Sequence, residues 1–240
     1  MDFPKEQRGR FTPVSKPQLK TRLFTRGGAI RPTIPQVMDY KKLSTSEKIE
    51  QVRQYHPYRE ERQYVANYLK ALRQNNQQLI EEYESFGNSP RQIIMNRRAY
   101  DRGQLFGFTR KTLDQYGWLE NAGFTSVEWI EFIDRKGWAA FNYVTIGQGA
   151  NGKWSYGASY LTGGSGGSYG LGIWGKVYNN RKECLTAALQ ELLNCHARQR
   201  ERLKNDPANF NPTLSNTVVK QVQTILQETT AAKQLTLLFN

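Results

Sequence analysis

Between residues 43 and 89 the apolar positions recur at three- and four-residue intervals, which is the spacing of one helix face. Ser44-Thr45-Ser46-Glu47 matches a capping box and predicts a helix that ends before Pro57. A second helix is predicted from Tyr58 to Phe86, ending at Gly87. Its apolar stripe consists of Val65, Tyr68, Leu69, Leu72, Leu79, Ile80 and Tyr83. Residues 43–89 are therefore predicted to form a helical hairpin whose stripe packs in the core, with a partner-binding groove as the alternative.

After a short predicted helix at 112–122, the pattern changes from helical to strand-like. Four segments rich in aromatic and β-branched residues are separated by turn sequences, namely 127–133, 138–146, 154–161 and 169–178. The glycine-rich residues 162–170 lie between two of these strands and do not lead into a helix with a following Lys. They predict a hairpin tip and not a phosphate cradle. We expect an antiparallel meander of three to four strands.

Helical spacing returns near Asn180, and the helix that begins there has an apolar face suited to lie on the sheet. That face consists of Cys184, Leu185, Ala188, Leu189 and Leu192. A proline-containing linker is predicted at 205–212, and a last helix from Leu214 to Glu228, after which the chain loosens at Thr229-Thr230. The elements predict an α+β fold. Residues 90–204 are expected to form its core domain, and residues 213–240 a C-terminal helix with a tail peptide.

Residues 1–42 show no helical or strand period and contain five prolines, which predicts an extended arm. The arm holds ten Lys or Arg against three acidic residues, so it is attracted to phosphates without reading sequence. The candidate phosphate contacts in it are Arg8, Arg10, Lys20, Arg22, Arg26 and Arg31. Its Phe and Leu residues leave a second interpretation open, in which the arm is anchored across the protein's own core.

The whole chain carries a formal net charge of +13 with a pI near 9.8, which implies attraction to polyanions. Nucleic acid is favoured over two other interpretations, a charge that only maintains solubility and an anionic membrane surface. A second basic cluster lies between Pro90 and Lys111 and is interleaved with Tyr100, Phe106 and Phe108. Its candidate binding residues are Arg97, Arg98, Arg102, Arg110 and Lys111. Arginines near aromatic rings suit phosphate neutralisation with base stacking, and a solvated helix face with buried aromatic rings is the alternative.

The sequence offers no clear pattern for catalysis, metal binding or a cofactor. Cys184 and Cys195 are predicted to lie on one helix about 16 Å apart, too far to form a disulfide or share a metal. His56 and His196 belong to no recognisable catalytic or metal-ligand pattern. The chain contains no continuous apolar run typical of a secretory signal or membrane span, so we expect a cytoplasmic protein without a membrane partner.

The extreme C-terminus carries the most specific short motif. Gln234-Leu235-Thr236-Leu237-Leu238-Phe239 resembles the bacterial sliding-clamp-binding peptide, whose pattern is Gln-Leu-x-Leu-x-Phe. The resemblance implies that the Gln234 amide bonds the rim of a cleft on the clamp, and that Leu235, Leu237 and Phe239 fill adjoining apolar pockets. The alternative is that these apolar residues pack in the protein's own core as a short final strand.

Residues 110–198 have a weaker, topological resemblance to a double-stranded-RNA-binding domain, because a helix, antiparallel strands and a second helix follow one another. The resemblance implies that a basic pair at the start of the last helix, Arg181 and Lys182, contacts phosphates across a groove. The chain departs from that pattern at Leu185, where a basic residue is expected, and in having four predicted strands.

These features predict a nucleic-acid-binding accessory protein of a bacterial, phage or plasmid system, with DNA favoured over RNA, brought to the sliding clamp by its terminal peptide. Two alternatives stay open. One is a metal-dependent nuclease that uses Glu131 and Asp134, although Asp134 falls where a hairpin turn is predicted. The other is a protein-interaction, inhibitor or structural protein whose arm wraps a partner.

Overall fold

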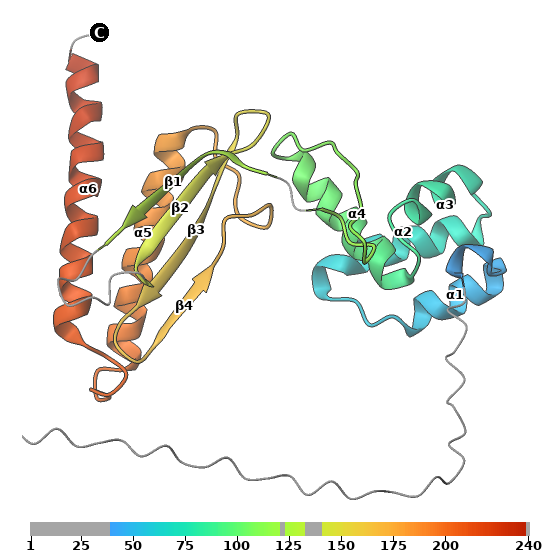
Figure 1. The fold of residues 1–240 in the computed structure, drawn as a ribbon, viewed down its shortest axis with the longest axis horizontal. Helices are drawn as coiled ribbons and strands as arrows, with labels where there is room; N and C mark the ends of the chain where they lie inside the picture. Colours follow the sequence, from blue (N-terminus) through green and yellow to red (C-terminus); the bar gives the residue numbers. More distant parts are fainter. Residues whose placement is uncertain (1–38, 121–122, 133–140, 239–240) are drawn as a thin grey trace, which may run out of the picture. The chain divides into compact units, whose positions relative to one another are not determined.

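The computed structural model describes residues 39–120, 123–132 and 141–238, with side chains described as far as Thr229 (Figure 1). Helices form the first part of this chain, and a four-stranded antiparallel sheet followed by two long helices forms the second. The α+β class predicted from the sequence is confirmed. Residues 1–38, which make up nearly all of the predicted arm, lie outside the described residues.

The first helices follow local capping signals. A short 3-10 helix, η1 (Tyr40–Lys42), precedes α1 (Thr45–Gln54). Ser44 forms the predicted capping box with Glu47: the Glu47 backbone N–H donates to the Ser44 hydroxyl at 3.4 Å, and the Ser44 N–H donates to the Glu47 carboxylate at 2.8 Å. The helix ends before Pro57, as predicted. The capping box therefore determines where the chain first becomes helical.

The predicted second helix of the hairpin is wrong as one element. In its place the chain forms η2 (Arg59–Glu61), α2 (Arg62–Arg73) and α3 (Gln77–Glu84). Asn75 adopts a left-handed backbone with φ of 50°, and the Asn76 side chain accepts the Leu79 N–H at 3.1 Å as the N-cap of α3. Asparagine tolerates the left-handed region and caps helices well, so this pair ends one helix and begins the next.

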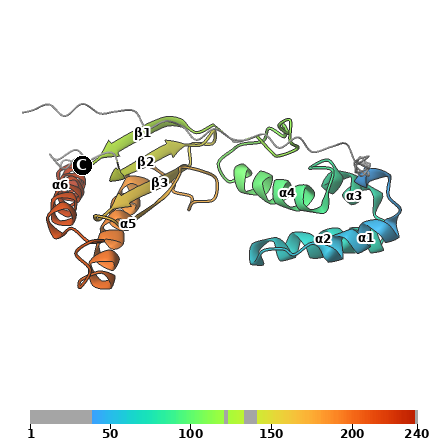
Figure 2. The same ribbon diagram turned by 60° about the horizontal axis from the view of Figure 1, so that its bottom comes forward.

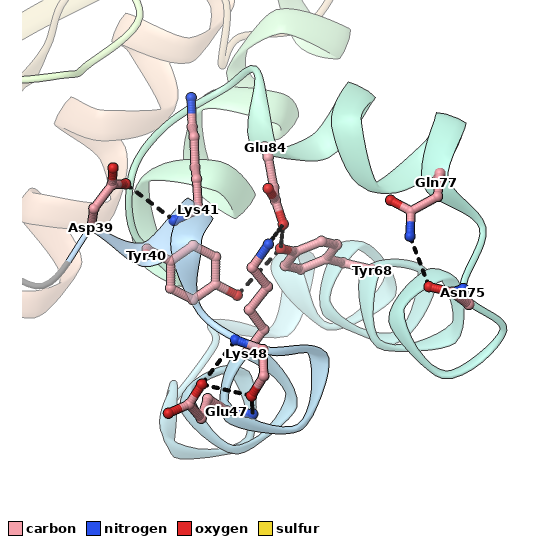
Figure 3. Close-up of polar contacts among 10 residues, drawn as sticks. Asp39, Tyr40, Lys41, Glu47, Lys48, Tyr68, Asn75, Gln77 and Glu84 are labelled. Carbon is pink, nitrogen blue, oxygen red and sulfur yellow. Dashed lines mark hydrogen bonds and ion pairs between the residues drawn. The ribbon is translucent and has the colours of Figure 1, made fainter.

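A buried polar cluster joins α1, α2 and α3 at the centre of the helical part (Figure 3). Lys48 donates to the Glu84 carboxylate at 2.7 Å, and the Tyr68 hydroxyl donates to the same oxygen at 3.0 Å. The Tyr40 hydroxyl lies 3.2 Å from that of Tyr68, and both rings are buried. Tyr40 and η1 thus belong to the folded part, so the predicted boundary of the arm at residue 42 was too late.

Helix α4 (Pro90–Gln104) begins at Ser89, whose hydroxyl accepts the Gln92 N–H at 3.3 Å. Its Ile93 and Ile94 are fully buried in the cluster that contains Leu72, and α2 packs against both α3 and α4 (Figure 2). Helix α4 therefore packs with the helical part, whereas the predicted domain boundary at residue 90 grouped it with the sheet. Its apolar face is directed to α2 because Ile93 and Ile94 lie on one side of the helix.

The short helix predicted at 112–122 does not form over residues 112–120. Asp114 instead holds a tight turn, in which its carboxylate accepts the N–H groups of Tyr116 at 2.8 Å and Trp118 at 2.9 Å. Leu113 and Leu119 pair across this turn as an isolated β-bridge. The Asp side chain competes with helical backbone bonding here, and the following Gly117, at φ of 79°, closes the turn.

The sheet is the predicted antiparallel meander in the order β1-β2-β3-β4. Its strands are β1 (Thr125–Glu131), β2 (Tyr143–Gln148), β3 (Trp154–Leu161) and β4 (Gly166–Tyr169). The last strand lies within the glycine-rich stretch, while most of the predicted strand at 169–178 is a loop that pairs with β3 only at Tyr178. A Cβ on Gly157 would lie 2.4 Å from the Leu171 backbone nitrogen, so this loop crosses directly over β3.

Two helices complete the second part. Helix α5 (Arg181–Arg202) packs on β2 and β3 through the predicted apolar face, and α6 (Pro212–Leu238) packs on α5 through Leu214, Val218 and Val222 (Figure 1). The predicted loosening at Thr229-Thr230 is wrong, because α6 continues to Leu238. The Thr229 hydroxyl donates to the Ile225 carbonyl of the preceding turn at 2.7 Å, a contact that Thr can make from a helical backbone.

Candidate nucleic-acid interface

The sequence-predicted contacts of the N-terminal arm, Arg8, Arg10, Lys20, Arg22, Arg26 and Arg31, lie outside the described residues. Residues 1–38 contain eight Lys or Arg and two Asp or Glu, so they account for six of the thirteen net charges of the chain. The remaining excess belongs to residues 39–240, and the structure shows which cations are paired among the described residues of that range.

The three arginines predicted on α4 are bound to groups of the protein itself. Arg97 pairs with Glu82 and, at 3.1 Å, with Asp101. Arg98 lies 3.8 Å from the Glu61 carboxylate, and its guanidinium lies 4.6 Å from the centre of the Trp174 ring. Arg102 donates to backbone carbonyls of the loop that follows β4; its acceptors are Ile173 at 3.0 and 2.9 Å and Gly175 at 2.5 Å. Arg97 and Arg102 are therefore hydrogen-bonded within the fold, and Arg98 is held by a longer ion pair and a ring contact.

The next two cations of this cluster are both exposed but differ in their contacts. Lys111 bonds the Ser85 hydroxyl and lies 3.6 Å from the centre of the Phe86 ring, and burial, followed by the nearby charge of Arg97, lowers its pKa. Arg110 is exposed and bonds only the neighbouring Thr112 hydroxyl, at 2.8 Å, among the described residues. Arg110 is thus the member of the predicted cluster that is best placed to meet an external anion.

The basic pair at the start of α5 is divided in the same way. Arg181 forms a two-pronged ion pair with Glu128 of β1, with both N–O distances 2.6 Å, and this pairing lowers the pKa of the Glu128 carboxyl. Lys182 is exposed and makes no ion pair with the described part of the chain. Arg181 therefore joins α5 to the sheet, and Lys182 remains accessible.

Four exposed cations outside the sequence-predicted clusters form a stripe on α2 and the preceding η2. Arg59, Arg62, Lys70 and Arg73 are exposed, and none has an ion-pair partner within residues 39–120, 123–132 or 141–229. At the helical rotation per residue, the last three fall within about 80° of one another, opposite the buried Tyr68. They extend over about 16 Å along the helix axis.

This α2 stripe had a signal in the sequence. Residues 62–80 contain no Asp or Glu, and the polar residues between the cations are amides such as Gln63, Asn67 and Gln74. Arginine, lysine and amide side chains are the groups that most often bond phosphate oxygens. The apolar spacing of this segment predicts its core face, and the absence of carboxylates marks the opposite face as a phosphate-compatible surface.

The terminal motif falls at the end of α6. Gln234, Leu235 and Leu237 belong to the last two helical turns, and Phe239 lies outside the described residues. The backbone at these three positions is helical, whereas the alternative interpretation expected a short final strand.

The residues considered for catalysis do not come together in the described structure. Residues 39–120, 123–132 and 141–229 contain no group of three His, Cys, Asp or Glu side chains that can hold a metal ion. Glu131 lies exposed at the end of β1, and Asp134 lies outside the described residues. Both cysteines are free and buried in α5. His196 is also buried, between Ser215 and Asn142.

No family model, curated protein or solved structure matches this chain. The fold defines the class of the protein as α+β, with a helical part followed by a meander sheet on which α5 packs, and with α6 packed on α5. No helix within the described residues is both long and apolar enough to cross a membrane.

Proposed function

We propose that this chain is a nucleic-acid-binding accessory protein, with DNA favoured over RNA, that is brought to the bacterial sliding clamp by its C-terminal peptide. The observation that carries the nucleic-acid part is the α2 stripe. Its four cations are exposed and have no carboxylate partner among the described residues, while the α4 arginines are used internally.

Uncompensated cations favour a polyanion for a physical reason. Each lysine or arginine that neutralises a phosphate releases a condensed counterion, so affinity rises with the number of free cations and falls steeply with salt. A cation already paired with a carboxylate contributes little, since it must first lose that partner. This proposal is supported by the cations that remain available to phosphates. They are the α2 stripe, Arg110, Lys182 and the six net positive charges of residues 1–38.

The clamp part of the proposal is supported by the terminal motif alone. A groove-bound peptide obtains most of its affinity from a few apolar anchors, here Leu235, Leu237 and Phe239, with Gln234 at the rim. Two weak sites on one chain act together, because binding at one raises the local concentration for the other.

Salt-dependent binding to a labelled duplex and a labelled single strand tests the nucleic-acid part. We expect the triple variant Arg62→Glu, Lys70→Glu, Arg73→Glu to reduce the slope of log affinity against log salt by about 2 to 3, since each lost phosphate contact removes about 0.7 to 0.9. The matched control, Arg53→Glu, Lys204→Glu, Lys220→Glu, makes the same change in net charge at exposed positions elsewhere. Equal loss in both variants rejects the α2 stripe, and salt-insensitive or absent binding by the intact protein favours the interaction-protein alternative.

Recovery on immobilised sliding clamp tests the other part. Intact protein should be retained, and a chain lacking residues 234–240 or carrying Leu235→Ala and Leu237→Ala should not be. Substitution of Thr236 by Ala, at the first of the two variable positions of the motif, is the control and should leave recovery unchanged. Equal recovery of all four proteins removes the clamp from the proposal and leaves nucleic-acid binding untouched.

A further inference from the structure

A cleft of about 750 Å³ opens beside α4 within the folded part of the chain. Its walls come from α4, from residues 107–120 with Gly123, and from residues 170–174 of the loop after β4. This volume is in the range of small-molecule sites, and neither the charge pattern nor the terminal motif accounts for it.

The walls of this cleft are held in place by polar side chains of α4. Asn96 donates to the Gly117 carbonyl at 2.8 Å and accepts the Leu119 N–H at 3.0 Å, so it fixes the turn that carries Trp118. Arg102 fixes the opposite wall through its three bonds to the carbonyls of Ile173 and Gly175. A site whose walls are already ordered loses little conformational entropy when a ligand binds.

The lining chemistry suits a flat aromatic group. Four aromatic side chains line the cleft, Tyr100, Phe108, Trp118 and Trp174. Two of the rings make cation–π contacts with arginine. The Arg98 guanidinium lies over the Trp174 ring, and the Arg91 guanidinium lies 5.7 Å from the centre of the Trp118 ring. Aromatic rings that alternate with guanidinium groups bind stacked bases in single-strand-binding proteins without requiring a particular base.

The charged groups at the cleft match the other parts of a nucleotide unit. Arg110 and Glu120 are the charged residues of its described lining. Arg110 is exposed and free for a phosphate, and the Glu120 carboxylate can accept a hydrogen bond from an exocyclic amino group. Gly170 and Gly172 line one wall, and a Cβ at either position would meet no atom within 4 Å, so there is room for a larger side chain there.

We propose that this cleft binds one unstacked base of a single-stranded nucleic acid, with the aromatic side chains against the base and Arg110 against the adjoining phosphate. The inference rests on the proposed function and deepens it, because it makes single strands the preferred partner of the folded part. A duplex keeps its bases stacked and cannot present one to the cleft without the cost of unpairing.

The test compares a short single strand with the same strand carrying abasic sites, by fluorescence anisotropy at fixed salt. The two strands have equal phosphate charge, so their affinity ratio isolates the bases. We expect the intact protein to bind the base-containing strand at least about fivefold more tightly, the lower end of the effect of stacking one base on aromatic side chains. Gly172→Leu should fill the cleft and bring the ratio close to one while leaving the salt slope unchanged.

Two further variants show whether a loss is specific. Val177→Leu places the same leucine side chain at an exposed position of this loop that does not line the cleft, and it should retain the ratio. Arg110→Gln should weaken both strands by the same factor, since it removes a phosphate contact and no base contact. Thermal unfolding of each variant confirms that the fold is intact.

The outcomes separate this inference from the proposed function. If the intact protein binds both strands equally, or Gly172→Leu keeps the full ratio, the cleft does not take a base, although salt-dependent binding still supports the broader proposal. Saturable binding of free thymidine monophosphate without any difference between the two strands overturns it as well, because the occupant is then a free nucleotide. No binding to any strand removes both proposals together.

Discussion

Acidification from pH 7.5 to pH 5.0 should weaken the second part of the protein through a single buried histidine. His196 of α5 is 1% exposed, and its Nδ1 lies 3.0 Å from the Ser215 hydroxyl of α6. Its Nε2 lies 3.1 Å from Asn142 Oδ1, which also accepts the Leu161 N–H at 2.9 Å. The ring therefore donates from Nε2 to Asn142, and in its neutral form it accepts from the Ser215 hydroxyl at Nδ1.

The size of the effect follows from the pKa of His196. Burial, and to a smaller extent the charge of Arg200, lowers this pKa from its ordinary 6.5 to about 4. Below pH 6.5 the unfolded chain takes up a proton at this residue before the folded chain does. The stability that the neutral ring contributes is therefore complete above pH 6.5 and declines as the pH falls to about 4. The linkage relation gives a loss of about 2 kcal/mol at pH 5.0 and about 3 kcal/mol in full.

Urea unfolding of the intact protein at pH 7.5 and 5.0 measures this loss directly. His56→Gln is the matched control, because His56 is the other histidine of the chain and is exposed. The control should lose as much free energy of unfolding as the intact protein, whereas His196→Gln, which cannot take up the proton, should lose much less. The NMR titration of the His196 ring in the unmodified protein gives the same answer if that variant does not fold. A midpoint near 6.5, or an unchanged loss in His196→Gln, would contradict the reasoning.

Three predictions concern the stability of other parts, each measured as the free energy of unfolding in urea. Lys48→Met should lower the free energy of unfolding by about 3 kcal/mol or more, because it leaves the Glu84 carboxylate buried without its partner. The double variant with Glu84→Leu should regain part of this stability, and an equally unstable double variant would argue against that cause. Ser44→Ala should cost about 1 kcal/mol through the lost capping bond, while Ser44→Asp should be nearly neutral. Gly157→Ala should lower the free energy of unfolding by about 1 to 3 kcal/mol, since its Cβ would lie 2.4 Å from the Leu171 backbone nitrogen. An unchanged urea midpoint would show that the loop after β4 moves to accommodate the methyl group.

Local signals in the sequence were enough to predict several elements. The capping box at Ser44, the aromatic and β-branched runs of the central segments, and the apolar face that begins near Asn180 all correspond to observed structure. In each case the deciding interaction joins residues close together in the chain, or one face of an element is apolar over its whole length. Such elements can be predicted from the spacing of residues along the chain, without knowing which distant residues they contact.

The structure decided matters that depend on distant residues or on competition between local choices. Asn75 broke a helix that apolar spacing predicted to be continuous, and Asp114 formed a turn where a helix was expected. Helix α6 continued past Glu228, where the polar threonines suggested that it ends. Spacing records which face is apolar, but it does not record whether a side chain prefers to bond its own backbone.

For the candidate site, the sequence by itself determined the amount of positive charge and its concentration near the N-terminus. Only the tertiary structure decided which cations of the folded part are available. Arg97 and Arg181 pair with carboxylates on other elements, 15 and 53 residues away in the chain. The cations of the α2 stripe pair with no carboxylate among the described residues. Pairing depends on what folding brings within a few ångströms, and composition contains no such distance.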